Sequence, residues 1–180
     1  NTNRILMGWE VPASWFQSLN AMFIIFLGTS VALYWANRKL KGKVSSSLFK
    51  MIIGLIIMGT GFFFMSAAAS EFNNTGASAM YWLVLAYLFH TIGELCISPV
   101  ALSYITKLAP VKYASLMMGV YFAMTGFGNK LAGLLGESAE GLGELTVFTG
   151  IAIFCVIFGL LVMIFRKKLE VLTHNAEDNE

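Results

Sequence analysis

Long apolar runs, each about the length of a membrane-spanning helix, dominate the pattern of hydrophobic and polar positions. Crossing a hydrocarbon core of about 30 Å takes roughly 20 apolar residues. Runs such as MIIGLIIMGTGFFFM lack the alternation of a barrel strand, so they predict helices. Five stretches are long enough, at approximately 13–36, 48–69, 80–106, 111–135 and 146–165. The pattern therefore predicts an all-α polytopic membrane protein with five transmembrane helices.

The composition supports this prediction. Of the 180 residues, 57% are hydrophobic and only 12% are charged, which is too little polar surface to enclose a water-soluble core. A cytosolic enzyme, a disulfide scaffold and a nucleic-acid-binding protein are therefore disfavoured. Cys96 and Cys155 both lie in apolar runs without the spacing of metal ligands, so we expect no metal site and no cofactor.

The positive charges predict the orientation, because Lys and Arg near span ends stay on the cytoplasmic side. Placed on the five spans, ten of them fall on one side: Arg38, Lys39, Lys41, Lys43, Lys50, Lys107, Lys112, Arg166, Lys167 and Lys168. The opposite loops contain Glu71, Glu137, Glu140 and Glu144, with Arg4 as their one base. We therefore expect an extracytoplasmic lead-in (1–12), a helical bundle (13–168) and a cytoplasmic tail (169–180). An outside N-terminus without a preceding span also suggests that further chain comes before Asn1.

The third predicted span carries an unusual row of polar residues. His90, Glu94 and Ser98 are spaced four apart, so they share one helical face that continues toward Leu102. An ionisable group within hydrocarbon costs at least a few kcal/mol and is a functional candidate by default. Glu94 has two roles open to it, binding a ligand ammonium or exchanging a proton, and a structural hydrogen bond to Lys130 is the alternative. We expect His90 and Lys130 themselves to be structural.

Three further residues are candidates for lining a cavity beside this polar face. Pro99 removes a backbone donor and so gives the third span a bending point, which suits a gate, although transmembrane helices widely tolerate proline without such a role. Tyr121 has an aromatic ring that closes a passage by bulk, although an interface position is an equal alternative. Asn20 offers a neutral amide to the polar end of a ligand. These residues predict a polar cavity within the bundle.

Three segments resemble one family of transporters. FHTIGELCISPVALSYITKLAP (89–110), LMMGVYFAMTGFGNKLAG (116–133) and WFQSLNAMFII (15–25) are similar to the proton-dependent oligopeptide transporter family of the major facilitator superfamily. The resemblance implies that the five spans are helices eight to twelve of a twelve-helix carrier, most of its C-terminal six-helix bundle. The N-terminal half of the same transporter is then a partner of this chain.

The resemblance also assigns roles to residues. Glu94 matches the family's helix-ten acid, which lies near the amino end of the peptide and forms a gating salt bridge. Ser98 matches its partner in that site, and Asn20 matches a helix-eight asparagine that contacts the peptide. Leu102 resembles a cytoplasmic gate residue, and Tyr121 replaces a tryptophan common in the family. Substrate-binding residues are thus expected at Glu94, Ser98, Asn20 and Tyr121, and gate residues at Leu102, Tyr121 and Pro99.

The expected function is proton-coupled import of di- and tripeptides by alternating access, with protons as the coupling ion. The expected location is the plasma membrane, in bacteria the inner membrane, where the helices contact lipid. Two alternatives remain: a major facilitator carrier for nitrate, a sugar or a drug, and a non-transporting scaffold subunit. An intramembrane zinc enzyme is disfavoured, because His90 and Glu94 form H-x-x-x-E rather than H-E-x-x-H.

Overall fold

The computed structural model describes residues 2–3, 5–6, 9–10 and 12–172. Most of this part consists of long helices: α1 (Ala13–Leu40), α2 (Ser47–Thr75), α3 (Met80–Leu108), α4 (Ala114–Leu142) and α5 (Glu144–Leu172). The other elements are short: β1 (Thr2–Asn3), β2 (Ile5–Leu6), β3 (Trp9–Glu10), β4 (Ser78–Ala79) and the 3₁₀ turn η1 (Val111–Tyr113). The prediction of an all-α chain is confirmed.

Four of the described helices are long and apolar enough to cross a membrane: Ser18–Leu40 within α1, and all of α2, α3 and α5. The remaining predicted span, 111–135, which is the fourth along the chain, corresponds to η1 and most of α4. This helix also has 29 residues, but Asn129 and Lys130 interrupt its apolar run. The helices extend beyond the predicted spans, and α5 continues through residues 169–172 of the predicted tail. Residues 173–180 lie outside the described part.

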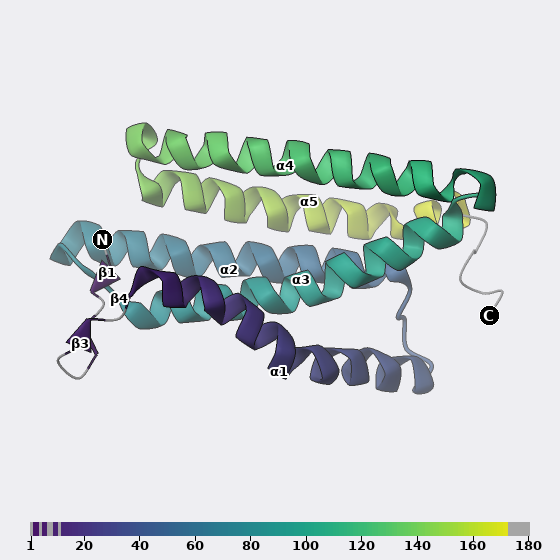
Figure 1. Cartoon of the computed structure of the whole chain (residues 1–180), viewed down its shortest axis with the longest axis horizontal. Helices are drawn as coiled ribbons and strands as arrows, with labels where there is room; N and C mark the ends of the chain where they lie inside the picture. Colours follow the sequence, from purple (N-terminus) through teal and green to yellow (C-terminus); the bar gives the residue numbers. More distant parts are fainter. Residues whose placement is uncertain (1, 4, 7–8, 11, 173–180) are drawn as a thin grey trace.

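Helix α2 is the centre of the bundle. It packs against α3 on one side and α5 on the other, while α1 lies along α3 and α4 lies along α5 (Figure 1). Glycines permit the close approach on both sides of α2. A Cβ atom on Gly54 would lie 2.7 Å from the carbonyl oxygen of Gly93, and one on Gly59 would lie 2.9 Å from Cγ2 of Val156. Small residues of this kind let transmembrane helices pack backbone to backbone.

The connection between α2 and α3 is held by a carboxylate. Gly76 ends α2 in the left-handed conformation, at φ 77°. Glu71 then accepts hydrogen bonds from Trp82 Nε1 at 2.6 Å and from the backbone nitrogen of Ala79 at 3.3 Å. In the connection, β4 pairs in parallel with β1, with Thr2 opposite Ser78. The predicted lead-in is therefore joined to the same end of the bundle.

The opposite end carries the basic residues. Three of them form, with two aromatic neighbours, what we call the basic–aromatic cluster: Arg38, Lys50 and Arg166 with Trp35 and Phe49. The guanidinium carbons of Arg38 and Arg166 lie 5.1 and 5.2 Å from the centre of the Phe49 ring. Arg166 also pairs with Glu170 at 3.4 Å, and Glu170 accepts a hydrogen bond from Ser46. These contacts join the ends of α1, α2 and α5.

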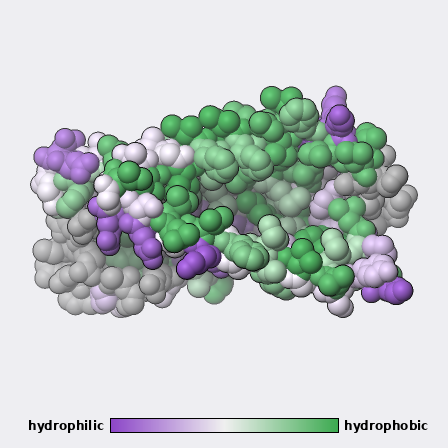
Figure 2. Space-filling model, turned by 90° about the horizontal axis from the view of Figure 1, so that it is seen from above, coloured by the Kyte–Doolittle hydropathy of each residue, from purple (hydrophilic) through white to green (hydrophobic). Residues whose placement is uncertain are grey.

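Large apolar side chains cover the outside of the bundle. Figure 2 shows a broad hydrophobic surface on one face, with hydrophilic residues in smaller groups. Ile25, Phe26 and Ile164 are 76%, 71% and 79% exposed. Exposure of this kind along whole helices is expected of a protein that is covered by lipid rather than by water.

Candidate functional site

The side chains of Asn20 and Glu94 meet between α1 and α3. Asn20 Nδ2 donates a hydrogen bond to Glu94 Oε2 at 3.1 Å, and both residues are half-buried. Helix α1 lies against α3 along this stretch, which brings together two residues 74 positions apart in the chain. The structure therefore places two of the residues named from the sequence in direct contact. The interhelical hydrogen bond of Glu94 goes to Asn20, while Lys130 is exposed on α4.

A third residue, which the sequence analysis did not select, completes this network. Thr91 is fully buried, and its hydroxyl donates to Asn20 Oδ1 at 2.6 Å and lies 2.8 Å from the carbonyl oxygen of Tyr87. Thr91 is three residues before Glu94, so the two share a helical face. This spacing from Glu94 is the feature of the sequence by which Thr91 could have been selected. We call Asn20, Thr91 and Glu94 the amide network.

His90 belongs to a different contact. Its ring packs on Phe62 of α2, with ring centres 4.5 Å apart. A Cβ atom on Gly61 would overlap Cδ2 of the His90 ring, so the missing side chain at Gly61 leaves room for the ring in this position. His90 therefore faces α2 while Glu94 faces α1, and the polar row predicted along α3 is divided between two neighbouring helices. This placement agrees with a helix-contact role for His90.

The remaining predicted residues lie farther along the bundle. Ser98 and Leu102 follow Glu94 at intervals of one turn on α3 and are half-buried, and Pro99 is exposed. Helix α3 continues past Pro99 to Leu108 without a break. Tyr121 is half-buried on α4, where its ring packs edge-on against Phe122. Within the described residues, the hydrogen bonds of the amide network include neither Ser98 nor Tyr121.

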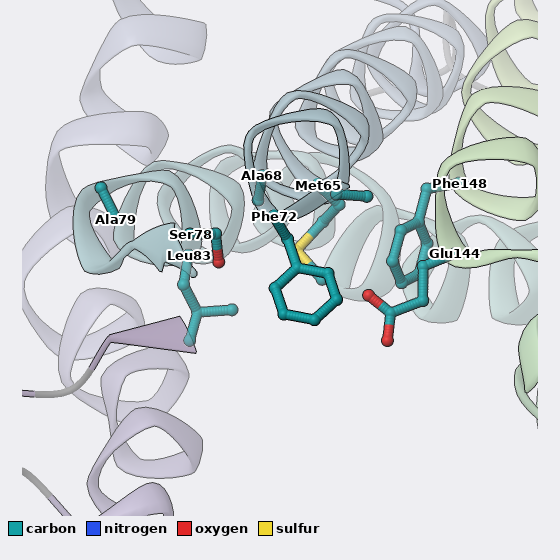
Figure 3. A pocket seen from close by; sticks show the side chains of 9 residues that line it. Met65, Ala68, Phe72, Ser78, Ala79, Leu83, Glu144 and Phe148 are labelled. Carbon is teal, nitrogen blue, oxygen red and sulfur yellow. The ribbon is translucent and has the colours of Figure 1, made fainter. Parts of the chain in front are cut away.

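A separate cavity lies at the end of the bundle where α2 and α3 are joined. It has a volume of about 60 Å³, room for a few water molecules, which is far below the size of a peptide site. Figure 3 shows its walls, with Phe72 and Met65 facing Glu144 and Phe148 of α5. None of the residues expected to bind substrate lines it. The described residues also contain no group of three or more His, Cys, Asp or Glu placed to hold a metal ion.

Known proteins with similar sequences are transporters. A family model described as "POT family" matches residues 1–141. The peptide transporter YePEPT of Yersinia enterocolitica is 35% identical over 184 residues, covering 99% of this chain and 36% of that protein. A di-/tripeptide transporter of Lactococcus lactis is 29% identical, covering 89% of this chain and 32% of its own length. The chain thus spans about a third of the relatives that it matches.

Solved structures agree with the sequences. The crystal structure of a peptide transporter POT in complex with sulfate has a TM-score of 0.83 and 29% identity, covering 93% of this chain and 33% of that one. A POT family transporter in complex with a thioalcohol-conjugated peptide has a TM-score of 0.80 and 26% identity, covering 91% and 34%. The chain belongs to the POT family, and its five helices make up most of the C-terminal bundle of a major facilitator fold.

Proposed function

We propose that this chain supplies one side of the peptide-binding cavity of a proton-coupled symporter, and that the complete transporter imports di- and tripeptides. Relatives named as peptide and di-/tripeptide transporters support the substrate class. A related structure that holds a peptide conjugate supports a peptide site in this fold. Because the chain spans about a third of these relatives, the rest of the transporter supplies the opposite side of the cavity.

The observation that carries the proposal is the hydrogen bond between Asn20 and Glu94. A carboxylate has about four acceptor positions, and the amide of Asn20 uses one of them. The others remain for the α-ammonium of a peptide, which has three donors. Attraction between opposite charges is several times stronger at a partly buried site than in water. Glu94 therefore binds the amino end of the peptide, beside the amide of Asn20.

The other predicted residues complete the binding and gating surfaces. Ser98 adds a hydroxyl one turn from Glu94, and the ring of Tyr121 adds an aromatic wall. Leu102 and Tyr121 close the cytoplasmic exit, and α3 bends near Pro99 as the exit opens. Protons flowing inward supply the driving force. Alternating access couples the movement of protons to the movement of peptide, because both use the same set of gates.

The orientation follows from the charges. The α1–α2 connection, the α3–α4 connection and the end of α5 lie at one end of the bundle (Figure 1), and this end carries the basic–aromatic cluster. Basic residues near span ends stay in the cytoplasm. We therefore place this end and the C-terminus inside, in the plasma membrane or the bacterial inner membrane.

The test replaces Glu94 by Gln in the complete transporter, reconstituted into liposomes with an inward proton gradient. Glutamine keeps the size of the side chain and its ability to accept from Asn20, but it lacks the charge. Since a hydrogen bond to a charged group contributes about 1.5–3 kcal/mol, we expect dipeptide uptake efficiency to fall at least about tenfold. Glu140→Gln, at an exposed position on α4, is the matched control and should leave uptake unchanged.

Three outcomes oppose the proposal. Normal uptake by Glu94→Gln, at normal levels in the membrane, removes the central residue. Competition of uptake by nitrate or sugars, but not by unlabelled dipeptides, assigns the carrier to another ligand class. No proton-coupled flux from the complete, correctly inserted protein supports the scaffold alternative.

A further inference from the structure

Thr91 is the fully buried member of the amide network, out of reach of any ligand. Its exposed fraction is 0%, and its hydroxyl reaches from α3 to the carbonyl oxygen of Asn20 on α1 at 2.6 Å. Glu94 Oε2 accepts a hydrogen bond from Nδ2 of the same amide at 3.1 Å. The amide of Asn20 is therefore held at both ends by α3, by a donor at its oxygen and by an acceptor at its nitrogen.

The orientation of the Asn20 amide decides whether its NH₂ group or its oxygen faces Glu94. An asparagine presents either two donors or an oxygen acceptor, depending on a half-turn of its terminal group. With the oxygen turned toward Glu94, two acceptors would face each other in a site of low dielectric, which is unfavourable. In the orientation that Glu94 favours, the amide oxygen faces Thr91, and the hydroxyl that donates to this oxygen holds the amide in place beside the carboxylate.

The position of the hydroxyl is set by α3. The Thr91 oxygen lies 2.8 Å from the carbonyl oxygen of Tyr87, one turn earlier, and 2.6 Å from Asn20 Oδ1, so its single hydrogen goes to one of these two acceptors, and to Asn20 in the network described above. Thr91 thus has little freedom of its own, and its position is set by the helix that also carries Glu94.

We propose that Thr91 is a positioning residue for peptide binding: its hydroxyl fixes the amide of Asn20 so that the NH₂ group faces Glu94. This inference rests on the proposed function, in which Asn20 and Glu94 receive the amino end of the peptide. Thr91 itself never touches the ligand. The prearranged amide holds the carboxylate in the geometry that the peptide ammonium meets. Loss of the Thr91 hydroxyl therefore weakens peptide binding, while the transport step is retained.

The test compares Thr91→Val with Thr91→Ser in the complete transporter, by uptake of a labelled dipeptide into liposomes. Valine keeps the branched shape without the hydroxyl, and serine keeps the hydroxyl. We expect Thr91→Val to raise KM about threefold to tenfold, the effect of one hydrogen bond, with the maximal rate nearly unchanged. Thr91→Ser should restore KM. Thr149→Val is the matched control, because Thr149 also donates across helices, to Ser66 at 3.0 Å, away from the amide network.

A double-mutant cycle separates positioning from a general loss of structure. If Thr91 acts through Asn20, Thr91→Val should change KM less than twofold once Asn20→Ala is present. An equal change in both backgrounds overturns the inference, as does an unchanged KM in Thr91→Val or in Asn20→Ala alone. If Thr91→Val does not reach the membrane, Thr91→Ala provides the same comparison. Normal uptake by Glu94→Gln instead counts against the proposed function itself.

Discussion

The carboxylate of Glu94 is accommodated between apolar helices without a basic partner in the described residues. An amide donor and partial exposure lower the cost of holding it there, and both are seen at Glu94. A buried salt bridge would neutralise the carboxylate permanently, whereas a neutral amide leaves its charge available. At the scale of single residues, this is the feature that suits a binding role better than a purely structural one.

Gly54 offers a test of packing at a single position. A Cβ atom there would lie 2.7 Å from the carbonyl oxygen of Gly93, a backbone atom that cannot move aside without shifting α3. Gly54→Ala should therefore destabilise the α2–α3 contact by about 1–3 kcal/mol, as overpacking does in well-packed cores. The measurement is the melting temperature of the purified transporter in detergent.

Gly150→Ala is the control for this substitution, because nothing lies within 4 Å of the added atom on α5. There alanine should be neutral or slightly stabilising, since it favours a helix over glycine. Equal melting temperatures for the two variants would show that the Gly54–Gly93 contact does not limit stability.

Single residues also mark how far the sequence alone could lead. Glu94 and Asn20 were both selected, because a charged group and an amide are unusual within apolar runs. Their contact was not derivable, since it depends on how α1 is rotated against α3, 74 positions apart in the chain. Thr91 was missed for the same reason. A threonine is common in membrane helices, and only its position opposite Asn20 gives it a partner.

At the scale of elements, hydropathy predicted the helices but not their ends. The spans follow the thickness of the hydrocarbon core, while the helices continue beyond it until a glycine or a proline-containing connection, such as Gly76 after α2. The pairing of β1 with β4 was also missed. Strands of two residues are too short to show the alternation by which strands are recognised.

The basic–aromatic cluster gives the prediction that belongs to this scale. The guanidinium groups of Arg38 and Arg166 both contact the ring of Phe49, so one ring links α1, α2 and α5. Each cation–π contact contributes about 0.5–1 kcal/mol at an exposed site. Phe49→Leu should therefore lower the melting temperature of the transporter by removing both contacts. Phe63→Leu, at a ring that is 43% exposed on the same helix, is the control.

A second substitution at Phe49 distinguishes the effect of an aromatic ring from the effect of side-chain size. Phe49→Trp should recover the stability, because a larger aromatic face attracts cations at least as well. If Phe49→Leu and Phe63→Leu melt at the same temperature, the guanidinium contacts do not join the three helices in solution.

At the scale of the whole molecule, apolar and charged side chains occupy different parts of the bundle surface. The apolar side chains cover its sides, as Figure 2 shows for one face. Apart from groups within the spans such as His90, Glu94 and Lys130, ionisable residues gather at its ends, with the basic–aromatic cluster at one end and Glu71 and Glu144 at the other. This is the distribution of a protein that crosses a membrane with its ends in water, and it makes the orientation testable.

Labelling of introduced cysteines tests that orientation in whole cells. Lys41→Cys, in the connection between α1 and α2, should react with a membrane-impermeant maleimide only after the cells are opened, because a basic connection stays in the cytoplasm. Glu140→Cys, near the α4–α5 connection, should react in intact cells. Both positions are exposed. The background replaces Cys96, Cys155 and any cysteine in the rest of the transporter by Ala, so that each signal has one source. Labelling of Lys41→Cys in intact cells would reverse the orientation and move the exit gate proposed at Leu102 and Tyr121 to the outer side of the membrane.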